Sequence, residues 1–234
     1  MTMIADHLQH VRQQIVQACQ QAGRVPEAVT LLAVSKTFGA DAVREAYAAG
    51  QRAFGENYIQ EAVDKIAALQ DLPLQWHCIG PIQSNKTRLV AEHFDWVHTI
   101  DRLKIAQRLS EQRPTDKPAL NVCIQVNIDS GPTKAGVPPE EALALAKAVA
   151  ALPRLHFRGL MTIPEPAPDF VAACAVHARA RALFDALNEA GLQLDTLSMG
   201  MTQDMEAAIA SGSTMVRVGT AIFGGRPPLR PASA

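Results

Sequence analysis

The sequence predicts an α/β fold: a (β/α)8 TIM barrel preceded by an extra N-terminal helix. Short apolar runs alternate with amphipathic segments almost from end to end. Eight candidate strands can be counted, with a helical pattern between each consecutive pair. A doubly wound open sheet shows the same alternation, and the count of eight favours the barrel. We expect one domain over residues 1–234, with its core over about residues 28–226 and a flexible C-terminal tail.

The elements follow one another without a linker that would divide domains. The first helical segment carries an apolar stripe, Ile4, Leu8, Val11, Ile15 and Cys19, and stops at Gly23. Candidate strands lie at residues 30–34, 52–54, 75–79, 96–98, 121–128, 156–161, 196–197 and 214–218. Helical patterns lie between them at residues 40–49, 58–69, 84–93, 102–112, 139–151, 170–190 and 202–210, and Gly50, Gly191 and Gly212 stand at expected C-caps. Turn-dense loops at 131–139 and 163–168 follow strands five and six, on the face where barrels build their sites.

The composition excludes several classes of protein. Hydrophobic residues make up 48% and charged residues 19% of the 234, which is typical of a globular chain. The net charge of −1 gives no field that would recruit nucleic acid or an anionic membrane. The four cysteines show no CxxC spacing, so we expect no metal, no disulfide framework and a cytoplasmic location. The start resembles no signal peptide, and no apolar stretch is long enough for a membrane span.

One lysine stands at the end of the first predicted strand. Lys36 follows the apolar run 30–34, and the chain then breaks at Phe38-Gly39. An ammonium at the rim of an apolar sheet is partly desolvated, which lowers its pKa and frees the amine to attack a carbonyl. Lys36 is therefore a candidate for Schiff-base chemistry. A solvated loop lysine is the alternative.

Small residues gather where strands seven and eight end. Ser198, Gly200, Gly219 and Thr220 would lie at one rim of the barrel. Small side chains let backbone N–H groups approach a phosphate, and barrels often bind phosphate after these two strands. Two ordinary glycine turns are the alternative.

Arg217 alternates with Val216 and Val218, so it projects from an apolar strand. A buried guanidinium needs an acceptor. That acceptor is either a ligand or a core carboxylate, for which Asp195 and Glu56 are the nearest candidates at strand ends.

Other polar residues have two interpretations each. Asn57 either binds a ligand oxygen or caps the helix that starts at residue 58, and Thr202 is a candidate N-cap with Asp204 in the first helical turn. His77 lies within an apolar strand and is read as a satisfied core histidine. Lys86 is either a second anion contact or a solvated lysine.

Several strings of residues occur in the order of one known family: AVSKTF, FGENYIQE, WHCIGPIQSNK, HTIDR, VNIDSGPTKAG, GLMTI, LSMGMTQDMEAAI and VRVGTAIFG. From about Leu31 to Arg226 the chain resembles the single-domain pyridoxal phosphate homeostasis proteins, relatives of the N-terminal barrel of alanine racemase. Thr202 stands where serine is common in that family, and Ile82 where leucine is common. Threonine keeps the hydroxyl group of serine, and isoleucine keeps the apolar character of leucine.

The resemblance implies a protein that holds pyridoxal 5′-phosphate as an aldimine on Lys36 and takes part in intracellular homeostasis and transfer of this cofactor. It implies phosphate contacts from Ser198, Gly219 and Thr220, with nearby backbone supplied by Met199, Gly200 and Met201. Arg217 would face the pyridine nitrogen, and Asn57 would lie near the ring substituents. Lys134 matches a further lysine that the family links to cofactor transfer. Expected partners are the cofactor and apo-enzymes that need it, and the chain is expected to be a monomer.

No catalytic residue is expected. An arginine can only donate to the pyridine nitrogen, which then stays unprotonated and makes the ring a poorer electron sink. Alanine racemase adds a catalytic tyrosine from a second domain and subunit, whereas Tyr47 and Tyr58 fall in helical segments and the chain ends after strand eight. The alternatives are a weak amino-acid racemase that uses Lys36 as its base and a Schiff-base aldolase barrel without cofactor.

Overall fold

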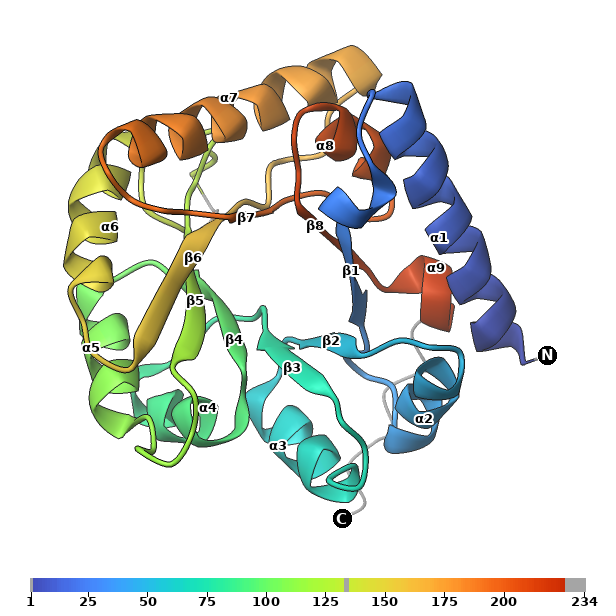
Figure 1. The fold of residues 1–234 in the computed structure, drawn as a ribbon, viewed down its shortest axis with the longest axis horizontal. Coiled ribbons are helices and arrows are strands. Elements are labelled where there is room, and N and C mark those ends of the chain that lie inside the picture. The colour runs from blue at the N-terminus through green and yellow to red at the C-terminus, as the bar shows by residue number, and fades with distance from the viewer. Residues whose placement is uncertain (1, 133–134, 226–234) are drawn as a thin grey trace.

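The structure is a computed structural model that describes residues 2–132 and 135–225, and within them eight parallel strands close into a barrel (Figure 1). The strands pair in chain order, and β1 (Thr30–Val34) pairs with β8 (Met215–Val218), with Leu32 opposite Arg217. The predicted TIM barrel is confirmed, and the open sheet is excluded. The remaining strands are β2 (Ala53–Glu56), β3 (Gln75–Cys78), β4 (Trp96–Ile100), β5 (Leu120–Gln125), β6 (Leu155–Met161) and β7 (Thr196–Ser198).

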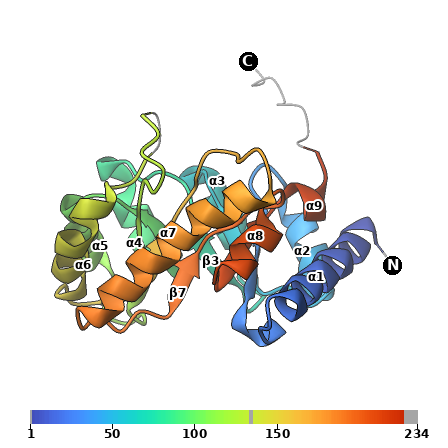
Figure 2. The same cartoon turned by 90° about the horizontal axis from the view of Figure 1, so that it is seen from above.

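Helices surround the barrel (Figure 1). They are α1 (Met3–Gln21), α2 (Ala40–Ala48), α3 (Ile59–Ala68), α4 (Thr87–His93), α5 (Leu103–Gln112), α6 (Ala142–Ala150), α7 (Phe170–Glu189), α8 (Met205–Ala210) and α9 (Thr220–Phe223). The extra helix α1 packs against α2, α8 and α9, which places it across the seam where β1 meets β8 (Figures 1 and 2). None of the described helices is long and apolar enough to cross a bilayer.

The predicted helix ends need small corrections. The predicted helices at 84–93 and 139–151 each begin with a 3-10 turn, η2 (Ser84–Lys86) and η3 (Pro139–Glu141). Another such turn, η1 (Pro26–Ala28), and the short α9 were not predicted. Gly50, Gly191 and Gly212 each follow a helix C-cap with φ between +94° and +100°, a conformation that glycine adopts without strain.

Apolar side chains form two layers because successive residues of a strand point to opposite faces. The larger cluster fills the space between strands and helices. A smaller one includes Leu32, Trp96, Met161 and Met215, whose positions alternate with those of the larger cluster and so face the barrel axis. Polar residues share that interior: His77, His98, Ser198 and Arg217 are all buried. The barrel interior therefore holds a polar core beneath the ends of its strands.

Candidate functional site

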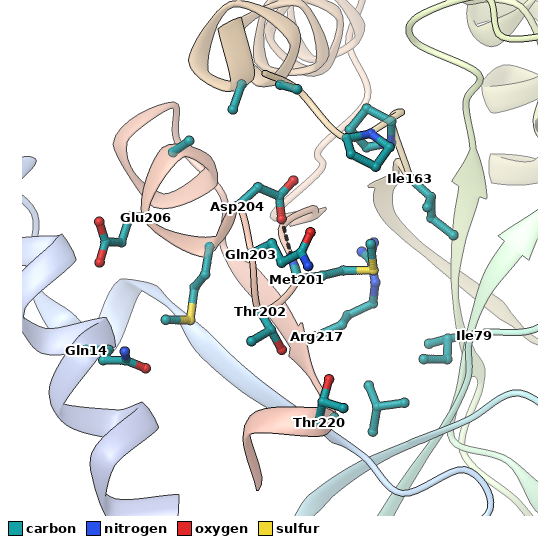
Figure 3. Close-up of a pocket in the computed structure, with 18 of the residues that line it drawn as sticks. Gln14, Ile79, Ile163, Met201, Thr202, Gln203, Asp204, Glu206, Arg217 and Thr220 are labelled. Carbon is teal, nitrogen blue, oxygen red and sulfur yellow. Dashed lines mark hydrogen bonds between the residues drawn. The ribbon is translucent and has the colours of Figure 1, made fainter. Parts of the chain in front are cut away.

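A cavity of about 850 Å³ lies over the carboxyl ends of the strands. Its walls come mainly from the segments that follow β1, β2, β6, β7 and β8, together with residues of α1, α7 and α8. Figure 3 shows Gln14 and Glu206 on one side of the cavity and Ile79 and Ile163 on the other. Six of the residues expected to contact the cofactor line it: Lys36, Asn57, Met201, Arg217, Gly219 and Thr220. This volume lies within the range of small-molecule sites.

Lys36 is half-buried in a tight turn directly after β1. The Phe38 N–H donates to the Ser35 carbonyl at 3.1 Å, which closes the turn. Thr37 has a φ of +68°, in the left-handed region that β-branched residues rarely adopt. The Thr37 N–H donates to Glu61 Oε1 at 2.7 Å.

A buried ion cluster lies beside this turn. Glu56, at the end of β2, accepts from Ser35 Oγ and from Lys65 Nζ on α3, both at 2.6 Å. Lys65 Nζ also donates to the Ser35 carbonyl at 3.0 Å and to Glu61 Oε1 at 3.1 Å. Burial raises the pKa of Glu56, and the Lys65 ammonium opposes that rise.

Arg217 rises from β8 beneath the cavity and is 4% exposed. Nη1 donates to Ser198 Oγ at 2.7 Å, and Nη2 donates to the Thr162 carbonyl at 2.8 Å. Burial lowers the pKa of Arg217 to about 10, so the guanidinium stays charged at neutral pH. The expected carboxylate partners are engaged elsewhere, since Asp195 pairs with Arg158 at 2.8 Å and Glu56 with Lys65.

A chain of hydrogen bonds leads from Arg217 down through the barrel. His98 Nδ1 lies 2.9 Å from Ser198 Oγ, His98 Nε2 lies 2.9 Å from His77 Nδ1, and His77 Nε2 lies 3.1 Å from Gln75 Oε1. Arginine only donates, so the serine hydroxyl accepts from it and donates its own hydrogen bond to His98 Nδ1. Each imidazole then accepts at Nδ1 and donates at Nε2. The expectation that His77 is a satisfied core histidine is confirmed.

The imidazoles of His77 and His98 are both held neutral. Burial lowers the pKa of His77 to about 3. Burial, followed by the proximity of His77 and Arg217, lowers the pKa of His98 well below its ordinary value. A neutral His77 matches the single direction of the hydrogen bonds, because a second proton at its Nδ1 would face the Nε2–H of His98.

Ser198, Met199 and Gly200 lie below the cavity and are buried. The Ser198 hydroxyl is engaged with Arg217 and His98. Gly200 has a φ of +98°, and a Cβ there would come within 2.5 Å of Ala208 Cβ, so the close approach of α8 requires glycine.

The segment after β7 corrects one predicted cap. Helix α8 begins at Met205 with Asp204 as its N-cap residue, so Thr202 is not the cap. Asp204 accepts from the Met201 N–H at 2.7 Å, and it bonds His177 Nε2 at 2.9 Å. Burial raises the pKa of Asp204, but these hydrogen bonds outweigh burial and hold the pKa below its ordinary value. Thr202 instead lines the cavity (Figure 3).

Asn57 is not a helix cap either. Helix α3 begins at Ile59, with Tyr58 as its N-cap residue and no side-chain cap bond. Asn57 Oδ1 is buried without a hydrogen-bond partner, as is Thr162 Oγ1. A Cβ on Gly80 would come within 2.1 Å of the Asn57 carbonyl oxygen, so the bare backbone of Gly80 lets Asn57 take its place.

One predicted lysine is not brought to this site. Lys86 ends η2, outside the lining of the cavity. Lys134 lies outside the described residues.

Prediction from the sequence did not point to Gln14, Glu61 or Lys65. Lys65 carried a usable signal, because it follows Ala62 by three residues and precedes Leu69 by four, which places it on the buried stripe of α3. Gln14 carried none, since it reaches the cavity only through the packing of α1 against α8 and α9.

Comparisons with known proteins agree on one family. The family described as alanine racemase, N-terminal domain, matches residues 7–227. The pyridoxal phosphate homeostasis protein of Pseudomonas aeruginosa is 60% identical over 233 residues, which cover 100% of this chain and 100% of that protein. Its Escherichia coli K12 counterpart is 57% identical over 229 residues, or 97% of this chain and 98% of that protein. The structure of PipY from Synechococcus elongatus with PLP bound is 41% identical, with a TM-score of 0.83 over 94% of this chain and 100% of that one.

Proposed function

Because the chain belongs to the pyridoxal phosphate homeostasis protein family, we propose that it binds pyridoxal 5′-phosphate covalently through Lys36 and serves the intracellular supply of this cofactor. The relatives that cover nearly all of the chain carry that name, and PipY has PLP bound. The observation that carries the proposal is that Lys36 and Arg217 line one cavity.

The residues of the cavity fit the phosphate end of the cofactor. Gly219 and Thr220 stand at the start of α9, where helical N–H groups have no acceptor within the helix. A Cβ on Gly219 would lie 3.2 Å from the Val34 carbonyl oxygen, so glycine suits this crowded place. Thr202 and Thr220 add exposed hydroxyl groups (Figure 3). We assign the phosphate to Gly219, Thr220 and Thr202. Ser198, which the resemblance implied as a phosphate contact, has its hydroxyl engaged by Arg217 and His98 and is assigned a supporting role with Met199 and Gly200.

Arg217 and Asn57, which line the same cavity, fit a pyridine ring. Two N–H groups of Arg217 are held by Ser198 and Thr162, which fixes the plane of the guanidinium and leaves other N–H groups to donate. A donor that keeps its proton leaves the ring nitrogen unprotonated. The unpartnered Asn57 Oδ1 can accept a hydrogen bond from a ring substituent.

When bound, the cofactor supplies an aldehyde whose carbon forms a C=N bond with the Lys36 amine as water leaves. The residues present support storage of the cofactor over catalysis. Tyr47 lies under the Arg52 guanidinium, 4.0 Å from it, and Tyr58 is exposed at the start of α3. Neither lines the cavity, so neither is placed as a second base. We therefore propose that the protein has no robust catalytic turnover.

Reduction with borohydride tests the assignment. Protein mixed with pyridoxal 5′-phosphate should gain a visible absorption band, and reduction followed by peptide mass spectrometry should place one pyridoxyl group on Lys36. K36A should lose both signals, whereas K147A, which removes an exposed lysine of α6, should keep them. An unlabelled Lys36, or equal labelling of K36A, contradicts the proposal. Measurable racemisation of alanine by the loaded protein contradicts the storage role.

We also propose that the protein is cytoplasmic and passes the cofactor to apo-enzymes. The free thiols of Cys19, Cys78 and Cys123 are buried, which suits a reducing compartment. Loaded protein is mixed with an apo-enzyme while a scavenging amine removes free cofactor. Recovery of the apo-enzyme's activity supports direct transfer, and no recovery above the scavenged control contradicts it.

A further inference from the structure

We infer that the ion cluster of buried Glu56 and Lys65 with half-buried Glu61 is a positioning device that fixes the direction in which Lys36 presents its amine. The inference rests on the proposed role of Lys36 as the residue that bonds the cofactor. None of the three cluster residues lines the cavity, so they act through the backbone of the turn.

The cluster holds the chain on both sides of Lys36. On the N-terminal side, Glu56 accepts from the Ser35 hydroxyl and Lys65 donates to the Ser35 carbonyl. On the C-terminal side, Glu61 accepts from the Thr37 N–H. Lys65 joins the two carboxylates by bonding both of them. Both neighbours of Lys36 are thus tied to one rigid group of charges.

The conformation of Thr37 shows why such a tie is needed. A β-branched residue at a φ of +68° is a genuine outlier, which persists only where its surroundings over-determine it. The bond from the Thr37 N–H to the charged Glu61 oxygen is short, at 2.7 Å. If Thr37 relaxed to an ordinary φ, the turn would rotate and the side chain of Lys36 would swing with it.

Stability alone gives a poor account of this cluster. The side chains of Glu56 and Lys65 are 0% and 4% exposed. Desolvation offsets much of the attraction in such a pair, and apolar residues of similar volume are often as stabilising. Placement of a reacting group gives a stronger reason, because bond formation requires the amine to meet the carbonyl carbon at a defined distance and angle.

Glu61 is the residue to change, because it is the member of the cluster that accepts from the Thr37 N–H, and its loss leaves Lys65 paired with Glu56. E61A removes the acceptor, and E61Q keeps an oxygen in its place. The double variant T37G/E61A frees position 37 to adopt a positive φ without a Cβ. E92A is the control for loss of a helical glutamate, because Glu92 forms an i,i+4 pair with Arg88 on α4, at 3.8 Å and away from this turn.

Two readouts are needed. The first is the rate at which Lys36 acquires a pyridoxyl group from pyridoxal 5′-phosphate and cyanoborohydride, followed by peptide mass spectrometry. The second is amide hydrogen exchange at Thr37 in protein without cofactor, measured by NMR, which a change in global stability would not alter selectively.

We expect E61A to label Lys36 about tenfold more slowly than the wild type and to lose protection at the Thr37 amide, since a hydrogen bond to a charged acceptor is removed. The rate of Lys36 labelling in E61Q and in E92A should stay within about twofold of the wild-type rate, and T37G/E61A should recover part of the rate that E61A loses. Wild-type labelling of E61A, or a protected Thr37 amide in E61A, overturns the inference. Failure of the wild type itself to label Lys36 overturns the proposed function instead, and the amide readout still decides whether the cluster holds the turn.

Discussion

The neutral histidine pair inside the barrel should make the fold sensitive to acid. His77 is buried and its pKa is lowered to about 3, while a histidine in the unfolded chain titrates near 6.5. Below pH 6.5 the unfolded state therefore binds more protons than the folded state. The free energy of unfolding should fall as the pH falls from 6.5 towards 3.

The size of this loss follows from the two pKa values. Between pH 7.5 and pH 5.0, His77 alone should lower the free energy of unfolding by about 2 kcal/mol. His98, whose pKa is also lowered by burial, acts in the same direction. Both effects are screened little, because no water reaches either ring.

Urea unfolding at the two pH values, followed by circular dichroism, measures this loss. H77Q keeps polar groups between His98 and Gln75 but removes one titrating site. Between pH 7.5 and pH 5.0 its free energy of unfolding should therefore fall by about 2 kcal/mol less than that of the wild type. H10Q, which replaces an exposed histidine of α1, serves as the control and should behave as the wild type does. An equal pH dependence in wild type and H77Q would refute the reasoning.

Three further outcomes follow from the site. R217L should weaken cofactor binding at least about tenfold, as seen by absorbance titration, because it removes the charged donor at the pyridine end and leaves two buried oxygens without their donor. G80A should displace Asn57 and lower the free energy of unfolding by about 2 kcal/mol in urea, because its Cβ would meet a backbone oxygen at 2.1 Å; an unchanged midpoint would contradict this. Burial raises the pKa of both Cys78 and Cys123 to about 12, so an aromatic disulfide reagent at pH 8 should label these thiols only in urea.

Most of the architecture could be predicted because it depends on local patterns. The strand at residues 30–34 was placed at its true ends, since an apolar run bounded by polar residues has few other arrangements. Helix starts were less predictable: Thr202 and Asn57 have the right chemistry for caps, but the helices begin later. Their positions are set by tertiary approaches, such as that of Gly80 to Asn57.

The sequence predicts which strand ends contribute residues to the candidate site, but not which hydrogen bonds those residues form. Closure of the barrel brings Lys36 and Arg217 to one cavity, as alternation in β8 and the position after β1 indicate. The partners of Arg217 could not be foreseen, because a serine and a main-chain carbonyl leave no charge signature in the sequence. That these residues contact the cofactor stays a prediction.

The position of α1 has a consequence for the order in which the chain acquires its structure during synthesis. Its anchors come from the far end of the sequence: His7 bonds the Ile222 carbonyl, and Arg24, just beyond the helix, bonds that of Ile209. Helix α2 is available early as a partner for α1, but full cover of the apolar stripe of α1, which includes Leu8 and Val11, also needs α8 and α9 from the far end of the sequence. Contacts between residues so distant in sequence slow folding. Until they form, the apolar face of α1 stays exposed in the nascent chain, where chaperones that bind amphipathic helices would recognise it.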